Sequence, residues 1–258
     1  MAAKAVSRVV LTPEFRGSYV NTIEATEFRE PGKPPSGKWA YTSEMIFTED
    51  SMSKFRVLRD GQLVFVDIRK ILEEIALEAW PELAGPAQPG QQFTPLQLAF
   101  IGPLSKGWPL KKGDQLADKA IAKATQQNKA APNVDHYRGH RVISAKSNVT
   151  TKTQPPVLAH LVKGNPKPVT LNRAVPSDMQ IAKTLMLGGN YFVAELNLKA
   201  SEVAGLKFIV PYLNAFTYTR EGTKFGFQGG ALMSRFEGVV GGESSHDPTA
   251  GLDAEIPF

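Results

Sequence analysis

Aromatic side chains recur beside lysine and arginine along the extended segments of this 258-residue chain. An aromatic ring can stack on a nucleobase, at about 1–3 kcal/mol per base, while lysine and arginine bind the phosphates between the bases. Rings of this kind also fill hydrophobic cores, so a core role is the alternative for each of them. The residues that this pattern selects as contacts to single-stranded nucleic acid are Tyr19, Lys38, Trp39, Tyr41, Lys111, Lys112, Tyr137, Arg138, Arg141, Lys146, Tyr191, Tyr212, Tyr218, Arg220, Lys224 and Phe225.

Charge is distributed unevenly along the sequence. All 30 lysines and arginines, and 20 of the 25 acids, lie in residues 1–235, which therefore carry a formal charge of +10. Residues 236–258 hold the other five acids in a composition rich in Gly and Ser, which buries too little surface to fold. We predict one folded domain over residues 1–235 and a flexible acidic tail over residues 236–258. Such a tail can bind a partner or the basic body itself.

The last residues of the tail combine acids with an apolar tip. Asp253 and Glu255 precede Ile256, Pro257 and Phe258. A tail that serves only solubility has no need of these apolar residues, so the five are candidates for contact with a protein partner. The alternative is a frayed terminus with no binding role.

Composition disfavours several classes of protein. The chain has no cysteine, which excludes disulfides, thiolate metal sites and a cysteine nucleophile. No stretch approaches the roughly 18 apolar residues of a membrane span. The first residues lack the apolar core of a signal peptide. We therefore expect a cytoplasmic protein without a membrane partner.

Motifs for catalysis are incomplete. Gly32–Lys38 matches the first seven positions of a phosphate-binding loop, but Trp39 stands where Ser or Thr should bind magnesium. His136 and His140 have the spacing of metal ligands on a helix, yet the segment around them is expected to be a strand. No nucleophile elbow is present. We predict no enzyme activity, no metal and no cofactor.

Hydrophobic periodicity predicts a chain that is mainly β. Strict alternation marks Lys38–Thr48 as a strand. Residues 6–28, Tyr137–Ser147, Asn190–Lys199 and Leu206–Arg220 are also expected to be extended, with an interruption of the last at Pro211. Along Leu206–Arg220, alternation places Phe208, Val210, Tyr212, Asn214, Phe216, Tyr218 and Arg220 on one face. A further strand is expected to begin at Thr223.

Few helices are expected. An apolar stripe predicts one over Asp67–Trp80, which Pro81 ends. Shorter helices are expected over Asp114–Gln127 and from Pro176 to about Leu187, with Ser177 as N-cap. Leu110–Asp114 is expected to be a basic turn. Many short strands with two or three helices favour a β-barrel with added helices and loops over an α/β fold.

A series of short segments resembles, in the same order, the phage single-stranded DNA-binding proteins long catalogued as a domain of unknown function. Two positions depart from that pattern, Lys112 for an acid and Asn190 for a small residue. The tip Ile256–Phe258 also resembles the end of the bacterial single-stranded DNA-binding proteins. The matching segments are Lys38–Ser43, Phe47–Asp50, Pro109–Asp114, Tyr137–Ser147, Leu187–Ala194 and Asn214–Tyr218 with Gly222 and Gly226.

This resemblance implies an OB-fold, a five-stranded β-barrel, carrying extra helices and long loops. It implies a protein that coats single-stranded DNA without sequence specificity during phage DNA replication, recombination and repair in the infected bacterial host cell. The acidic tail would recruit a polymerase, helicase or nuclease and would compete with DNA for the basic surface. A homodimer is a further candidate assembly. The competing hypothesis is a non-catalytic structural or assembly protein whose tail is a docking peptide.

Overall fold

The computed structural model of the chain describes residues 5–27, 34–100, 107–150, 154–165 and 167–225. Strands dominate these residues, which confirms the prediction of a mainly β chain with a few helices. The strands are β1 (Ser7–Leu11), β2 (Phe15–Glu27), β3 (Trp39–Phe47), β4 (Phe55–Arg59), β5 (Gln62–Val66), β6 (Leu110–Lys112), β7 (Arg141–Asn148), β8 (Val157–His160), β9 (Val169–Leu171), β10 (Tyr191–Val203) and β11 (Leu206–Arg220).

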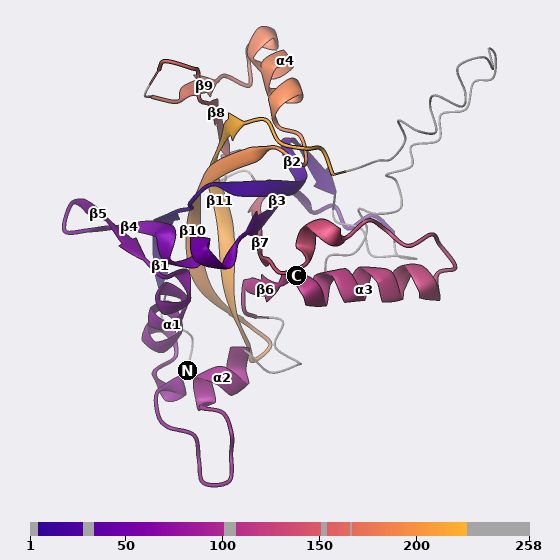
Figure 1. The fold of residues 1–258 in the computed structure, drawn as a ribbon. Coiled ribbons are helices and arrows are strands. Elements are labelled where there is room, and N and C mark those ends of the chain that lie inside the picture. Colours follow the sequence, from indigo (N-terminus) through magenta and orange to yellow (C-terminus); the bar gives the residue numbers. More distant parts are fainter. Residues whose placement is uncertain (1–4, 28–33, 101–106, 151–153, 166, 226–258) are drawn as a thin grey trace.

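The helices lie at the ends and along one side of the sheet (Figure 1). The α-helices are α1 (Ile68–Ala79), α2 (Pro95–Phe100), α3 (Gly113–Gln126) and α4 (Pro176–Leu185). Short 3₁₀ turns are η1 (Glu49–Lys54), η2 (Pro81–Leu83) and η3 (Asp135–Tyr137).

Five strands close a ring through backbone hydrogen bonds. β10 pairs with β2, β2 with β3, β3 with β7, β7 with β11 and β11 with β10. The contact between β7 and β11 is parallel, whereas the other four are antiparallel. From this ring the sheet extends through β1 and β4 to an edge at β5, and through β8 to an edge at β9.

The inner face of the ring is aromatic. Phe15 lies 5.3 Å from Phe47 and 5.8 Å from Phe216 between ring centroids, and Phe192 lies 4.4 Å from Phe216. These phenyl groups come from β2, β3, β10 and β11. Their packing in the core therefore also stabilises the closed arrangement of the five strands. Aromatic pairs at these separations add about 0.5–1.5 kcal/mol each beyond their burial.

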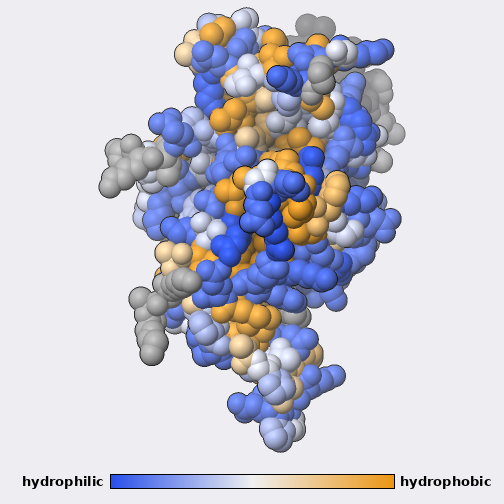
Figure 2. Space-filling view, turned by 90° about the vertical axis from the view of Figure 1, so that its left-hand side faces the viewer, coloured by the Kyte–Doolittle hydropathy of each residue, from blue (hydrophilic) through white to orange (hydrophobic). Residues whose placement is uncertain are grey.

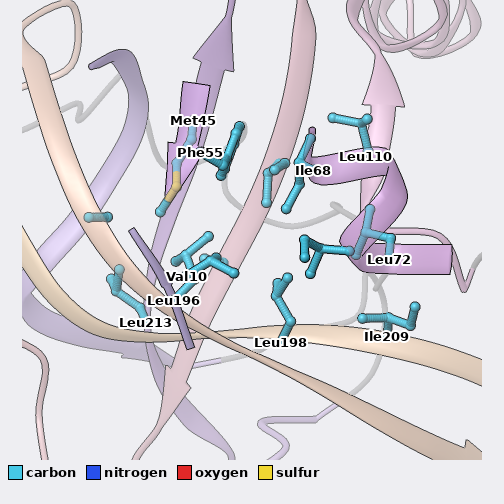
Figure 3. Packing of buried hydrophobic residues seen from close by; sticks show 14 of the residues in the cluster. Val10, Met45, Phe55, Ile68, Leu72, Leu110, Leu196, Leu198, Ile209 and Leu213 are labelled. Carbon is cyan, nitrogen blue, oxygen red and sulfur yellow. The ribbon is translucent and has the colours of Figure 1, made fainter. Parts of the chain in front are cut away.

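Helix α1 continues this core beneath β1 and β10, as Figure 3 shows. Ile68 and Leu72 are fully buried and lie in one cluster with Val10 and Leu198. The apolar stripe that predicts this helix is therefore the face that it buries. The helix begins after Asp67, whose side chain accepts a hydrogen bond from the Arg69 backbone N–H at 2.9 Å, as an N-cap does.

A second, smaller cluster covers part of the outer face of the ring. Ile46 of β3 and Val142 of β7 are buried there beneath Ala117 of α3 and Tyr137 of η3. β3 is consequently covered on both faces over its second half, where five consecutive residues are buried. β3 therefore changes along its length from an exposed and half-buried strand to one that is buried on both faces.

A β-bulge in β11 overturns one expectation from the sequence. Leu196 pairs with Leu213 and Glu195 with Ala215, so Asn214 has no directly paired residue. The extra residue reverses the alternation: Leu213 and Phe216 both face the core, and Phe208 and Phe216 lie on opposite faces. Pro211 does not interrupt the strand, since it continues the ladder opposite Leu198.

Other boundaries also differ from the predictions. Leu110–Lys112 forms a short strand against β7 rather than a turn, because it extends the sheet. Tyr137 lies in η3, and the strand predicted from it begins at Arg141. Val175 rather than Ser177 is the N-cap of α4, because Pro176 occupies the first turn. Residues 223–225 are not in a strand, and the rest of that predicted strand lies outside the described residues.

Candidate nucleic-acid interface

An open groove of about 380 Å³ lies on the outer face of the sheet. Its walls come from the end of the β10–β11 hairpin, from β7, and from the segment that leads into β6. Three aromatic rings and two lysines are among its lining residues. The groove is lined by Gly107, Trp108, Pro109, Lys111, Ser144, Lys146, Ser201, Val203, Phe208, Ile209, Val210, Pro211 and Tyr212.

Strand register brings the polar and aromatic groups of the groove together. Tyr212 of β11 is the parallel partner of Lys146 of β7. Lys111 of β6 pairs with Val142, and residues two apart on a strand share a face, so Lys111 lies on the same side of the sheet as Ser144 and Lys146.

Trp108 is held beside β11 by close backbone packing. The Ile209 N–H donates to the Gly107 carbonyl at 3.0 Å. A Cβ at Gly107 would lie only 2.0 Å from the Lys207 carbonyl oxygen, so a glycine is required at this approach. The Trp108 ring packs on Phe100, with 5.3 Å between centroids. The indole is therefore a fixed wall of the groove and not a free side chain.

Both groove lysines are partly dehydrated. Burial lowers the pKa of Lys111, although the charge of Glu44 opposes this effect. Burial also lowers the pKa of Lys146, and the neighbouring charge of Lys38 lowers it further. A cation that has lost part of its hydration gains more from an anion than an exposed one does, so the groove favours a negatively charged ligand.

A buried polar cluster lies beneath the Lys111 end of the groove. Glu44 is buried and accepts a hydrogen bond from the Tyr137 hydroxyl, which also lies 3.1 Å from Ser18 Oγ. Burial raises the pKa of the Glu44 carboxyl. Burial, with the nearby charge of Glu44, also raises the pKa of the Tyr137 hydroxyl. Tyr137, which the sequence predicts as a DNA contact, is only 5% exposed, so its ring is buried in this cluster.

Three predicted arginines are paired with carboxylates. Arg138 lies 2.7 Å from Asp118 and Arg141 lies 2.7 Å from Glu49. Arg220 binds both carboxylate oxygens of Glu14, and its guanidinium lies 3.4 Å from the centre of the Tyr191 ring. Arg220 therefore covers one face of Tyr191. These residues lie outside the groove.

The Phe225 ring packs against two cationic or titratable side chains of the body. The Arg16 guanidinium lies 4.1 Å from the ring centre, and His136 lies 4.1 Å from it between centroids. Arg16 also donates to the Gly189 carbonyl at 3.2 Å. These contacts hold Phe225 against the body, outside the groove. Lys224 beside it is exposed.

The other predicted contacts are dispersed. Tyr41 lies beneath the Arg173 guanidinium, 4.9 Å from it, and Tyr218 packs on Phe192, 6.1 Å from it between centroids. The remaining positions, Tyr19, Lys38, Trp39 and Lys112, are exposed. Of the predicted set, the groove thus brings together Lys111, Lys146 and Tyr212, with the charge of Lys38 close to Lys146.

Two groove aromatics are absent from the predicted set. Trp108 stands three residues before Lys111, so the rule of an aromatic residue near a lysine also applies to it. Phe208 directly follows Lys207, so the same rule applies to it as well. The tail residues Asp253, Glu255, Ile256, Pro257 and Phe258 lie outside the described residues.

Within the described residues, no group of three His, Asp or Glu side chains could hold a metal ion. None of the described helices has the length and apolarity needed to cross a bilayer.

Comparison with known proteins finds similarity in structure. No protein-family model and no curated protein sequence matches the chain. The single-stranded DNA-binding protein from bacteriophage Enc34, solved in complex with single-stranded DNA, is 16% identical over 88% of this chain and 98% of that chain, with a TM-score of 0.45. Its C-terminal truncation is 15% identical over 87% and 97%, with a TM-score of 0.46. The gp2.5 single-stranded DNA-binding protein encoded by bacteriophage T7 is 12% identical over 93% and 100%, with a TM-score of 0.36.

Proposed function

We propose that this protein binds single-stranded DNA without sequence specificity and that the groove on the outer sheet face is part of the binding surface. The observation that carries the proposal is the meeting of Trp108, Phe208 and Tyr212 with Lys111 and Lys146 in one open groove. Stacking platforms beside phosphate-binding cations are the two elements that single-stranded nucleic acid requires.

The lining explains why little sequence preference is expected. Every base has a flat face that can stack on an aromatic ring, and a lysine binds any phosphate. Base identity would have to be read through side-chain hydrogen bonds, and the neutral polar groups of the lining are the hydroxyls of Ser144, Ser201 and Tyr212 and the indole N–H of Trp108. A hydroxyl both donates and accepts, so it discriminates weakly between base edges.

The wider role follows from the sequence resemblance. We infer an OB-fold protein that coats DNA during phage replication, recombination and repair, without catalysis. In this proposal residues 236–258 form a flexible acidic tail that recruits a polymerase, helicase or nuclease through Asp253, Glu255 and Ile256–Phe258. The same tail would compete with DNA for the positive charge of the body, since it carries the opposite sign.

The test is the fluorescence anisotropy of a labelled oligo-dT across a salt series. We expect Tyr212→Ala to weaken binding by about 5- to 150-fold, the equivalent of one stacking contact. We expect Lys146→Gln to lower the slope of log affinity against log salt by about 0.7, the value for one phosphate on a single strand. Matched controls are Phe93→Ala and Lys70→Gln, at exposed positions outside both the groove and the predicted set of contacts, which should change affinity by less than twofold. A truncation after Arg235 should bind more tightly than the full chain if the tail competes.

Two results would overturn the proposal. If the full chain and the truncation both fail to bind at low salt, DNA binding is refuted and the structural or assembly role takes its place. If binding occurs but the controls weaken it as much as the groove variants do, the groove is not the binding surface.

A further inference from the structure

Strand β5 is an open edge with an unusual composition. It lies at the end of the strand order, with β4 as its neighbour, so its other edge is unpaired among the described residues. Its sequence, Gln62-Leu-Val-Phe-Val66, contains no charge, glycine or proline. Edge strands are usually protected by lysine, proline or a bulge, because their free N–H and C=O groups pair readily with another strand. β5 itself has none of these protections.

One face of the β4–β5 hairpin is mostly apolar and exposed, and it carries one charged residue, Arg56, opposite Phe65. Leu58 pairs with Leu63, and Phe65 lies on the same side two residues further along. Phe65 is 72% exposed, Leu58 65% and Leu63 51%, whereas Val57 on the other side is 4% exposed. Val9 of the adjacent strand β1, 48% exposed, continues this face. Figure 2 views the side from which the hairpin projects and shows apolar surface near its centre.

We propose that β5 pairs antiparallel with β5 of a second copy of this chain, which joins the two sheets about a twofold axis. Full overlap of the five residues places Val64 opposite Val64 and Leu63 opposite Phe65. Leu63 and Phe65 of both copies then lie on the same face of the joined sheet, so the exposed apolar residues of the two copies meet. Aromatic and aliphatic residues directly opposite each other stabilise a strand pair, and no charge lies in either strand.

A second copy fits this surface better than DNA does. Leu58, Leu63 and Val9 cannot stack on bases as aromatic rings can, β5 contributes no cation, and the hairpin places one partly buried cation, Arg56, on this face. Four side chains exposed to these extents present on the order of 400 Å², about half of the ~800 Å² that each partner of a stable complex buries. We therefore expect a weak dimer, with a dissociation constant on the order of 10–100 µM.

The absence of cysteine makes a direct test available. In the proposed pair, the Cα atoms of the two Val64 residues would lie about 4.5–5.5 Å apart, within the range that a disulfide spans. On mild oxidation of the full chain we expect Val64→Cys to form a disulfide-linked dimer. Leu206→Cys, an exposed position at 61% on another hairpin, is the matched control and should form at least tenfold less at the same concentration.

Sedimentation equilibrium on the unsubstituted chain provides the second readout. We expect a monomer–dimer equilibrium that Phe65→Asp weakens at least tenfold and Leu206→Asp leaves unchanged. Both substitutions are at exposed positions, and unchanged thermal melting would show that the fold is retained. Monomers at every concentration, equal cross-linking at both cysteine positions, or a dimer insensitive to Phe65→Asp would each overturn the proposal. So would a loss of oligo-dT affinity in Phe65→Asp under conditions where the protein is monomeric, because that result would assign the face to DNA.

Discussion

Arg173 is the side chain whose replacement should cost the most stability among the exposed or half-buried residues described above. Its guanidinium donates to the carbonyls of Ile23 and Thr22 at 2.7 Å and of Pro156 at 3.0 Å. It also lies against the Tyr41 ring, and burial lowers its pKa. One side chain thus ties β2, β3 and the segment before β8 together.

The magnitude follows from what Arg173→Met leaves behind. Methionine retains the apolar stem but orphans three carbonyls, and an unsatisfied buried polar group costs about 1–3 kcal/mol. The site is half-buried, so water will hydrate part of it, and we expect a loss of about 3 kcal/mol. Arg220→Met is the matched control, because Arg220 also covers a tyrosine but binds the carboxylate of Glu14 at an exposed position. An exposed ion pair contributes about 0.2–1 kcal/mol.

Urea unfolding, followed by tryptophan fluorescence, measures both changes on the same chain. Arg173→Lys should recover only part of the loss, since one ammonium cannot reach three carbonyls on two segments in the planar arrangement of a guanidinium. If Arg173→Met and Arg220→Met differ by less than 1 kcal/mol, the tie between the three segments is not a source of stability and the reasoning fails.

Three further changes can be tested on the same unfolding assay. Burial, with the positive charge of Arg16, lowers the pKa of His136 to about 4, so the unfolded state binds more protons than the folded state between about pH 6.5 and pH 4. Stability should fall over that window, by about 1–2 kcal/mol after allowing for the partly exposed ring, and His136→Phe should abolish this fall. The Glu44 carboxyl should have the opposite effect: because burial raises its pKa, the unsubstituted chain loses stability as pH rises through that raised pKa, and Glu44→Gln removes this loss. The free energy of unfolding of Glu44→Gln should therefore increase relative to that of the unsubstituted chain from pH 4 to pH 7; a constant difference would argue against an ionised carboxylate in this cluster. Gly113→Ala would place a Cβ 1.9 Å from the Tyr137 carbonyl oxygen and should destabilise the chain by about 2–3 kcal/mol, whereas a loss below 0.5 kcal/mol would show that η3 moves freely.

The parts of the fold that the sequence predicts are those in which one face of an element is buried. The stripe of Ile68, Ile71, Leu72 and Ile75 has the period of a helix because one side of α1 meets the core and the other meets water. The first eight residues of β10 alternate for the same reason, with Phe192, Ala194, Leu196 and Leu198 buried. These patterns are local, so a sequence reveals them without knowledge of the partners.

The features that could not be predicted from the sequence depend on contacts between segments that are distant in the chain. The bulge at Asn214 is defined by its register against β10, and nothing in Leu206–Arg220 alone marks it. Tyr137 is adjacent to Arg138 in sequence, but its hydroxyl donates a hydrogen bond to the buried Glu44, 93 residues earlier. The sequence pattern selects Lys111, Lys146 and Tyr212 of the groove but not Trp108. Trp108 lies in the groove because the backbone beside it, at Gly107, contacts the distant strand β11.

The position of β11 in the sheet has a consequence for synthesis of the protein. β11 is the last strand along the described chain, yet it pairs with β10, β7 and β8. The ring therefore cannot close until residue 220 has left the ribosome, and earlier intermediates leave edges of β7 and β10 unpaired. Contacts between segments so distant in sequence form slowly, and open edges are the sites at which nascent chains associate. Synthesis that halts before Leu206 should consequently yield aggregated chains, whereas chains completed through β11 can close the sheet on themselves.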